Sequence, residues 1–489
     1  MLNREHLSNI DSFYHLSGTN PLEGSCQGLA CFVARHQNPE QSEDATSQRP
    51  KLYCLGKCYL APSSTGCDKR PYVKVDSSVP IVLERIISGG ARSIASYTKA
   101  GGYTALESAL TRGRDELIRE IDMSGLRGRG GAGFPTGKKW RAVFDESSKE
   151  KFVVANGDEG DPGAYIDRFI IEDDPFALVE GITIAGYAVG ARNGYVYLRA
   201  EYPAACTVLE GAIVEARRQG LLGARVLGTD FNFDIRIVMG QGSYLCGEET
   251  ALLNSIEGRR PEVRVRPPFP TSKGLWGKPT LVNNIETLAC VPWIVYNGGI
   301  PYSTLGSRTS TGTKMVSLNS LFQRPGLYEI EFGVSVRHIV EELGGGLKTG
   351  DLKGVIIGGP LAGIIPPQLL DTTFGFEELR AIGASVGHGG VVAFDRRTSI
   401  ADLMHHVFDF GAFESCGKCT PCRLGTREIE QMFREILKRG PGESTQKLEL
   451  EELTTALALT SLCGHGSGLA EFATSVLRYY PEELQSCFA

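Results

Sequence analysis

The chain has 489 residues, 42% of them hydrophobic and 22% charged, which is the composition of an ordinary globular protein with several domains. The formal net charge of −6 argues against a general nucleic-acid binder, which needs a basic face. No run of about 18 apolar residues is present, so we expect no membrane span. Residues 1–20 lack the basic start and apolar stretch of a signal peptide, and we expect a cytoplasmic protein.

Residues 1–80, the first expected domain, contain two pairs of cysteines. Thirteen cysteines are many for a chain without a secretion signal, and their clustering indicates metal ligands rather than disulfides. Cys26 and Cys31 form one pair, and Cys54 and Cys58 form the other. Two pairs can give two thiolates to each iron of a 2Fe–2S cluster. A zinc site and cysteines without a metal are the alternatives.

A helical connector and an α/β domain follow. Apolar residues at helical spacing predict helices within residues 81–121. Residues 122–304 alternate short apolar runs with amphipathic stretches, a pattern that favours a parallel sheet with ligands at the carboxyl ends of its strands. The predicted strands are residues 151–155, 195–199 and 234–239, and the predicted helices are residues 174–191 and 201–219.

Within the α/β domain, a glycine-rich loop has the chemistry of an anion cradle. Its glycines let backbone N–H groups approach a phosphate closely, and neighbouring cations add positive charge. The spacing matches neither a Walker A nor a Rossmann motif, so it does not support ATP hydrolysis. The glycines are Gly128, Gly130, Gly131 and Gly133, and the cations are Arg127, Arg129, Lys138 and Lys139.

Three further polar loops are expected at strand ends in the same domain. Acidic side chains there can accept hydrogen bonds from ribose hydroxyls, and asparagine amides can both donate to and accept from a flavin ring. Phe269, between prolines, offers a rigid face for stacking on a flat ring. The loops are residues 156–163, residues 247–250, and residues 267–284 with Asn283 and Asn284 at their end.

Two more domains complete the chain. Residues 305–398 begin with a predicted hairpin, residues 314–318 and 327–331, and continue with a helix and a strand, which indicates a β-grasp domain. Residues 399–489 are mostly helical.

The helical tail carries the strongest metal signal. Cys416, Cys419 and Cys422 have the spacing that wraps one corner of a 4Fe–4S cubane, and Cys463 completes four thiolates. Zinc is the alternative, although it usually takes its ligands as two separated pairs. We therefore predict a 4Fe–4S cluster.

Taken together, these motifs resemble one family over residues 110–489. Gly-Arg-Gly-Gly-Ala-Gly-Phe-Pro-Thr-Gly, Gly-Glu-Glu-Thr-Ala-Leu and Ser-Cys-Gly-Lys-Cys-Thr-Pro-Cys-Arg resemble the NADH-binding flavoprotein subunit of respiratory complex I. They are also similar to its homologues in soluble NAD-dependent formate dehydrogenases (beta subunit) and NAD-reducing hydrogenases (diaphorase subunit). The resemblance implies hydride transfer between NADH and FMN, and single-electron transfer to iron–sulfur clusters.

The resemblance also implies the residues of the site. NADH would stack on the flavin with its adenine near Phe134 and its nicotinamide near Phe269, while Glu249 and the acidic loop with Glu159 and Asp161 would hold its ribose hydroxyls. Phe269 and Glu249 would thus serve the reaction directly. The chain has Asp161 where the family usually has Glu, and Arg266 where it usually has Lys. The implied FMN contacts are Gly128, Arg129, Gly130, Lys139, Asn156, Asp158, Gly247, Glu248, Asn283 and Asn284.

The N-terminal segment resembles a shortened thioredoxin-like 2Fe–2S subunit of the same enzymes. Its fusion to the flavin subunit by analogy favours the beta subunit of an NAD-dependent formate dehydrogenase, with the diaphorase subunit of a NAD-reducing NiFe hydrogenase or a complex I subunit as alternatives. The implied partners are a 2Fe–2S thioredoxin-like subunit and a large catalytic subunit containing molybdenum, tungsten, or nickel and iron. The expected fold is a multidomain α/β chain: a truncated thioredoxin-like domain (1–80), a helical connector (81–121), a Rossmann-like FMN and NADH domain (122–304), a β-grasp domain (305–398) and a helical-bundle 4Fe–4S domain (399–489).

Overall fold

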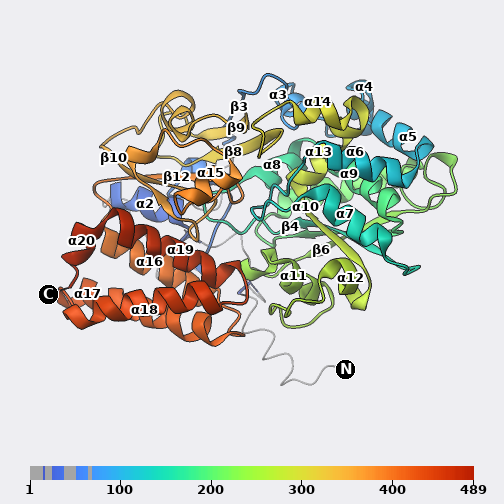
Figure 1. The fold of residues 1–489 in the computed structure, drawn as a ribbon. Helices are drawn as coiled ribbons and strands as arrows, with labels where there is room; N and C mark the ends of the chain where they lie inside the picture. The colour runs from blue at the N-terminus through green and yellow to red at the C-terminus, as the bar shows by residue number, and fades with distance from the viewer. Residues whose placement is uncertain (1–14, 17–24, 38–50, 64–68, 489) are drawn as a thin grey trace.

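The computed structural model describes residues 15–16, 25–37, 51–63 and 69–488, and shows a mixed α/β protein with two large sheets (Figure 1). One sheet is wholly parallel and the other is mixed. The last helices of the chain form a separate layer below the mixed sheet in this view. No helix of the described residues is long and apolar enough to cross a membrane.

The parallel sheet has the strand order β6-β5-β4-β7. Alternate side chains of β4 face opposite sides, as strand geometry requires. Val153 and Ala155 join the main core, whereas Phe152 and Val154 pack with Leu252 on the other face. The sheet is therefore buried on both faces, which explains its nearly continuous apolar strands. Its strands are β4 (Phe152–Gly157), β5 (Asn193–Leu198), β6 (Asp234–Met239) and β7 (Thr280–Asn284).

Three of these strands agree with the predicted ones, and β7 was not predicted. Its sequence, Thr-Leu-Val-Asn-Asn, is short and follows residues typical of turns, so its strand character depends on pairing with β4.

Helices cover both faces of the parallel sheet. Helix α9 is buried along almost its whole length because α13 and the connector helices α5 and α6 pack on it. The α-helices between residues 84 and 303 are α3 (Glu84–Ile87), α4 (Ile94–Lys99), α5 (Thr104–Thr111), α6 (Arg114–Met123), α7 (Thr136–Asp145), α8 (Ile166–Asp173), α9 (Pro175–Val189), α10 (Pro203–Arg218), α11 (Glu249–Ile256), α12 (Pro270–Lys273), α13 (Ile285–Asn297) and α14 (Gly299–Ser303).

The mixed sheet has the order β11-β10-β12-β8-β9-β3. The predicted hairpin is present, with β8 and β9 antiparallel. Strand β3 pairs in parallel with β9, so this segment of the predicted domain 1–80 belongs to the second sheet. The elements are β3 (Tyr72–Val75), β8 (Thr313–Leu318), β9 (Gly326–Glu331), β10 (Leu352–Ile357), β11 (Ile364–Ile365), α15 (Phe376–Ala381) and β12 (Gly390–Asp395).

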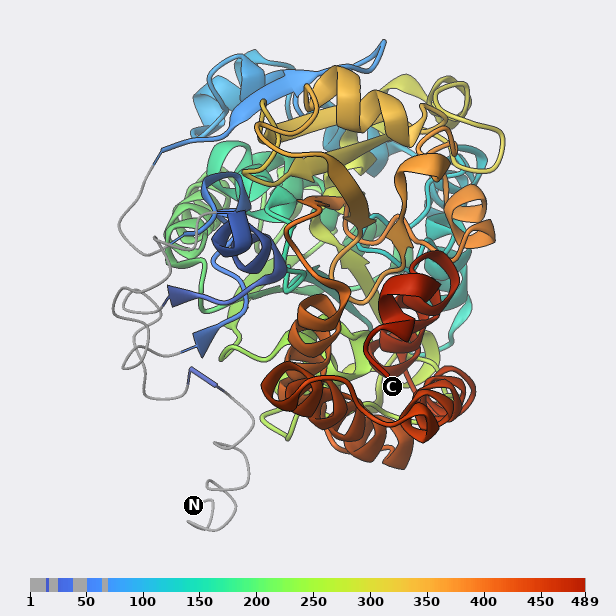
Figure 2. The same cartoon turned by 90° about the vertical axis from the view of Figure 1, so that its left-hand side faces the viewer.

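The described N-terminal residues form a small module against the rest of the chain (Figure 2). It consists of β1 (Ser25–Cys26), α2 (Leu29–Gln37) and β2 (Lys51–Leu52), with β1 and β2 parallel. Phe32 stacks on His406, and the hydroxyl of Tyr53 donates to Asp409 at 3.1 Å, so the module is attached to the C-terminal helices. Other parts of the predicted domain lie outside the described residues.

The C-terminal layer consists of α16 (Ile400–Phe413), α17 (Thr426–Arg439), α18 (Ser444–Thr460), α19 (Gly464–Tyr479) and α20 (Pro481–Gln485). Short 3-10 and π-helical segments complete the described chain: η4 (Cys58–Leu60), η5 (Val226–Gly228), η6 (Tyr244–Gly247), η7 (Leu275–Gly277), η8 (His338–Leu343), η9 (Pro367–Leu369) and η10 (Pro421–Gly425).

Candidate functional site

A cavity of about 610 Å³ lies beside the carboxyl ends of β4 and β7. The parts of the chain that enclose it include the glycine-rich loop, the loop after β4, the turn η6, residues 383–388 of the second-sheet domain, and the start of α19. Its volume is typical of sites that bury a small molecule or cofactor. Of the predicted site residues, those that line it are Gly130, Asn156, Asp158, Asp161, Gly247, Glu248 and Asn284.

The glycine-rich loop reaches this cavity because its glycines permit close approach. A Cβ on Gly130 would lie 2.9 Å from the Cβ of Asn284. Gly131 has a φ of +120° and forms an isolated antiparallel bridge with Gly387 of the second-sheet domain. A side chain at either glycine would push the loop away from the cavity wall.

Two half-buried carboxyl groups in the wall each have one buried oxygen without a hydrogen-bond partner among the described residues. These oxygens are Oδ2 of Asp158 and Oε1 of Glu248. The other oxygen of Glu248 caps α11 by accepting from the backbone N–H groups of Thr250 and Ala251, both at 2.9 Å. Burial raises the pKa of Asp158 well above its ordinary value. A polyhydroxylated ligand such as the ribityl chain of FMN fits such a wall, because its hydroxyls would satisfy these oxygens.

The Asp161 carboxyl also lines the cavity and is held by one neighbour. Its Oδ1 accepts from the hydroxyl of Tyr244 at 2.8 Å, and burial raises its pKa. Asn156, next to it in the wall, donates from Nδ2 to the carbonyl of Gly247 at 2.8 Å. These contacts fix polar groups at the carboxyl end of β4.

Several predicted FMN contacts lie outside the cavity wall. The guanidinium of Arg129 is buried and donates to Tyr302 Oη at 2.8 Å and to the carbonyls of Thr311 and Thr313 at 2.8 and 3.0 Å. Asn283 accepts from the indole of Trp140 at 3.0 Å. Gly128 is likewise not part of the wall. The Arg129 side chain therefore supports the glycine-rich loop from behind.

Glu159 is also directed into the protein rather than into the cavity. Its side chain is buried and accepts from the backbone N–H groups of Asp167 and Arg168 at 3.0 and 3.1 Å. This carboxylate thus satisfies the first turn of α8, where a negative charge is favoured.

A charged cluster lies close to the wall residue Glu248. Lys139 Nζ is 2.9 Å from one oxygen of Glu249, and Arg266 is 3.2 Å from the other. None of the three lines the cavity. Phe134 and Phe269 are 52% and 53% exposed and also lie outside the wall, so both rings are open to a ligand from solvent.

The C-terminal cysteines gather around one small apolar hollow. Cys416, Cys419, Cys422 and Cys463 line it together with Val263 and Leu462, and all four thiols are free. Gly417, with a φ of +73°, turns the chain between the first two cysteines. Four free thiols around one apolar hollow are the donor set of a 4Fe–4S cluster.

The N-terminal cysteines form a second buried group. The sulfurs of Cys54 and Cys58 are 3.3 Å apart, and Cys26 lies within hydrogen-bonding reach of both Cys31 and Cys54. The backbone N–H groups of Gly56 and Ser63 donate to Cys54 and Cys31, each at 3.3 Å. The residues of the two predicted pairs therefore meet in one place, with N–H donors directed at sulfur.

An arginine links this cysteine group to the acidic loop after β4. Arg199 donates to the carbonyl of Cys54 at 3.0 Å and also to the carbonyl of Glu159. The N-terminal module therefore contacts the domain that contains the cavity.

The sequence interpretation missed part of the wall. Tyr244, Leu245, Asp167 and His388 line the cavity but were not predicted. The sequence Gly387-His388-Gly389-Gly390 is the one local signal that could have drawn attention to His388, because glycines on both sides indicate a sharply turned, closely packed loop.

Two family models match parts of this chain. The family described as the Nuo51 FMN-binding domain matches residues 121–293, and the NADH-ubiquinone oxidoreductase-F iron-sulfur binding region matches residues 402–487. The F 2 subunit of NADH-quinone oxidoreductase in Rhizobium meliloti (strain 1021) is 42% identical over 406 residues, which are 83% of this chain and 96% of that protein.

Two further similarities extend to hydrogenases. NADP-reducing hydrogenase subunit HndC of Solidesulfovibrio fructosivorans is 41% identical over 395 residues, 81% of this chain and 80% of that protein. The crystal structure of a NAD+-reducing NiFe-hydrogenase in the H2-reduced state superimposes with a TM-score of 0.84 at 28% identity, covering 100% of this chain and 88% of that chain.

Proposed function

The chain belongs to the family of NADH-quinone oxidoreductase F subunits and related hydrogenase subunits, which are FMN-dependent NADH oxidoreductases, and from this premise we propose that it is the NAD(H)-reactive subunit of an NAD-dependent dehydrogenase complex. It has the FMN-binding domain and the 4Fe–4S region of this family. In the proposed complex it exchanges electrons between NAD(H) and a partner subunit with its own substrate.

One observation carries this proposal: the cavity and the C-terminal cysteine hollow have a common wall. Leu245 and His465 line both of them. A flavin in the cavity would therefore be separated from a cluster on the four thiolates by single side chains. Bound FMN supplies the conversion between two-electron hydride transfer and single-electron transfer to a cluster.

The chain's own residues bind and orient in this proposal. Asn156, Asp158, Glu248 and Asn284 would hold the flavin from the wall, and the backbone of the loop at Gly130 would approach its phosphate. Glu249, with its two cationic neighbours, would hold the ribose of NAD(H). The exposed ring of Phe269 would stack on the nicotinamide and exclude water. No acid or base is needed for the hydride step.

We also propose a 2Fe–2S cluster on Cys26, Cys31, Cys54 and Cys58. The meeting of the two pairs and the N–H donors to sulfur support it. The domains proposed for the rest of the chain are the helical connector, the FMN and NADH domain, a β-grasp domain extended by β3, and the helical 4Fe–4S domain.

The partner subunit sets the overall reaction. The fused N-terminal cysteine module supports an NAD-dependent formate dehydrogenase with a molybdenum or tungsten subunit. The likeness of the whole chain to a NAD+-reducing NiFe-hydrogenase supports a hydrogenase as the second candidate. Anaerobic purification of the native complex distinguishes them, since formate-driven NAD+ reduction with molybdenum or tungsten supports the first and hydrogen-driven reduction with nickel supports the second.

The test of the proposed function itself is made on the chain loaded with FMN, iron and sulfide. NADH should bleach the flavin absorbance and reduce an artificial dye. In Cys463→Ser, NADH should still bleach the flavin, while the EPR signal of the reduced 4Fe–4S cluster should be lost. A wild-type chain that binds no FMN would overturn the proposal.

A further inference from the structure

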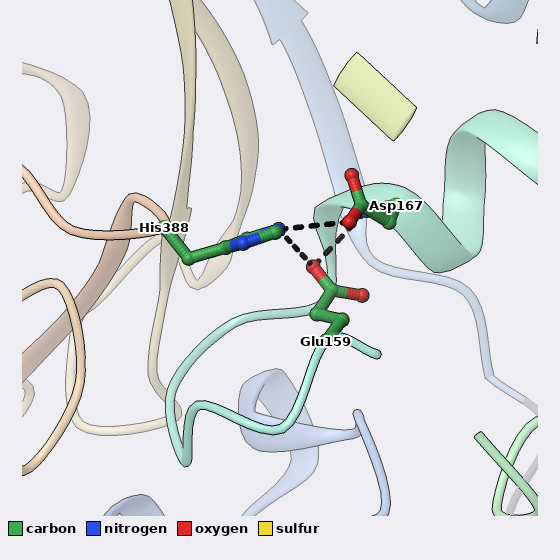
Figure 3. Close-up of side chains that lie close together, drawn as sticks. All are labelled: Glu159, Asp167 and His388. Atoms are coloured by element: carbon green, nitrogen blue, oxygen red, sulfur yellow. Dashed lines mark hydrogen bonds and ion pairs between the residues drawn. The ribbon is translucent and has the colours of Figure 1, made fainter. Parts of the chain in front are cut away.

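A buried charged triad joins the two sheet domains at the cavity (Figure 3). His388 Nε2 lies 3.1 Å from Oε1 of Glu159 and 3.2 Å from Oδ2 of Asp167. The side chains of Glu159 and Asp167 are 0% and 1% exposed, and that of His388 is 7% exposed. Asp167 and His388 line the cavity. Two buried carboxylates without a cation would be very costly, so the triad needs a proton on the imidazole.

The histidine reaches the triad from the second-sheet domain through a tightly turned loop. Gly387 and Gly389 have φ values of +50° and +95°. A Cβ on Gly387 would lie 2.1 Å from the Cα of Gly358, and one on Gly389 would lie 2.4 Å from the carbonyl of Met315. The loop is therefore fixed in a conformation that only glycine tolerates on both sides of His388.

Asp167 connects the imidazole of His388 to other residues of the cavity wall. Its Oδ2 accepts from Asn284 Nδ2 at 2.7 Å. Asn284 Oδ1 in turn accepts from the backbone N–H of Thr287 at 3.2 Å and caps α13. The hydroxyl of Thr287 accepts from the backbone N–H of Arg129 at 2.8 Å. A continuous set of contacts thus runs from His388 to the glycine-rich loop.

We propose that His388 is a positioning residue of the cofactor site, whose imidazolium keeps Asp167 ionised and thereby fixes Asn284 and the glycine-rich loop against the flavin. The proposal rests on the proposed FMN site and assigns a role that the sequence interpretation did not. Asp167 and Glu159 hold the pKa of His388 well above its ordinary value, although burial alone would lower it.

The other charged groups around the triad do not replace this proton. Lys314 donates to the carbonyl of His388 at 3.0 Å, but it forms a buried ion pair with Glu286. Asp161 also acts on His388 from the loop after β4, and as an acid it favours the imidazolium. Arg199, on the far side of Glu159, donates to Glu201 at 2.6 Å.

A divalent metal on the same three side chains is the alternative occupant. Oε1 of Glu159 already accepts from the backbone N–H groups of Ile166 and Asp167. Oδ2 of Asp167 already accepts from Asn284. Both oxygens nearest to the imidazole are thus engaged within the protein, which favours a proton over a metal.

The test measures FMN dissociation constants at pH 6 and pH 8 for wild type, His388→Gln, Asp167→Asn and the double variant. Wild type should differ little between the two pH values. His388→Gln should bind FMN about tenfold more weakly at pH 8 and less so at pH 6, where Asp167 takes up the missing proton. In the double variant the loss at pH 8 should be smaller than in His388→Gln, because one buried charge is gone. His338→Gln is the matched control, because His338 also lies between two carboxylates but does not line the cavity.

A readout that needs no cofactor is the ¹⁵N NMR signal of His388, assigned by the His388→Gln variant. An imidazolium at pH 8 supports the proposal, and a neutral imidazole at that pH overturns it. An equal loss of FMN affinity at both pH values would make His388 a packing residue. Stoichiometric metal in wild type that is absent from His388→Gln would also refute the proposal. If wild type itself bound no FMN, the proposed function would fail, and the NMR result would still decide the charge of His388.

Discussion

At the scale of single residues, the cavity wall combines polar side chains from the ends of β4 and β7 with His388 from the second-sheet domain. The family resemblance implied FMN contacts at Asn156, Asp158 and Asn284, and all three line the cavity. Arg129 was predicted to contact FMN, but its guanidinium is engaged by carbonyls of the adjacent domain. The contact of His388 with its two carboxylates could not be predicted, because they are more than 200 positions away in the sequence and only the fold brings them together.

The exposed ring of Phe269 gives the first prediction. Phe269→Ala should raise the KM for NADH about tenfold, equal to about 1.4 kcal/mol of lost stacking, and leave folding unchanged because the ring is 53% exposed. Steady-state dye reduction measures the effect. Tyr296→Ala, which removes another exposed aromatic ring, is the control. An unchanged KM would remove Phe269 from the nicotinamide site.

Glu249 gives the second prediction, since it holds both Lys139 and Arg266 outside the cavity wall. Glu249→Gln should raise the KM for NADH several-fold, about 1 kcal/mol, while the flavin content stays within a tenth of wild type. Kinetics and flavin absorbance are measured on the same preparation. The exposed Glu341→Gln should change neither. Loss of flavin instead would place Glu249 at the FMN.

At the scale of elements, periodicity located the long or strongly patterned segments. Strands β4, β5 and β6 and the hairpin of β8 and β9 agree with the predicted ranges because their apolar runs are bounded by turns. Strand β7 was missed because its short sequence does not by itself indicate a strand. Its strand conformation depends on pairing with β4 in the folded protein. The glycine-rich loop was identified from its spacing of glycines, but its packing against the second-sheet domain was not expected.

This packing of the loop leads to the third prediction. Arg129→Ala should lower the free energy of unfolding of the cofactor-free chain by about 2–4 kcal/mol, because it leaves buried carbonyls and the Tyr302 hydroxyl without their donor. Denaturant unfolding measures it. Arg119→Ala, on an exposed pair, should cost less than about 0.5 kcal/mol. Equal stability with weaker FMN binding would indicate a direct flavin contact instead.

At the scale of the whole molecule, the sequence predicted an α/β protein with clustered cysteines, and the fold confirms the α/β class. The sequence did not predict that Tyr72–Val75, within the expected domain 1–80, would form the edge strand of the second sheet. From the sequence, such an edge strand is assigned to the preceding domain, because its own residues do not indicate which sheet it joins.

The arrangement of the two cysteine groups gives the fourth prediction. Cys54→Ser should remove about two irons per chain and the corresponding EPR signal, while NADH-driven dye reduction stays within twofold of wild type, because the flavin cavity adjoins the other group through Leu245 and His465. Cys206→Ser, a thiol outside both groups, is the control. A full iron content in Cys54→Ser would exclude an N-terminal cluster.

The pairing of β3 with β9 has a consequence for how the N-terminal module stays in place. Tyr72 to Val75 are in register with Gly326 to Glu329, only nine positions after Ser63, which hydrogen-bonds Cys31 inside the module. So short a tether makes docking of the module an intramolecular event with an effective concentration in the millimolar range. A contact surface too weak to hold a separate protein is therefore enough to keep this module beside the flavin domain. A separate protein of the same size would need a larger binding surface, and the covalent connection removes that need.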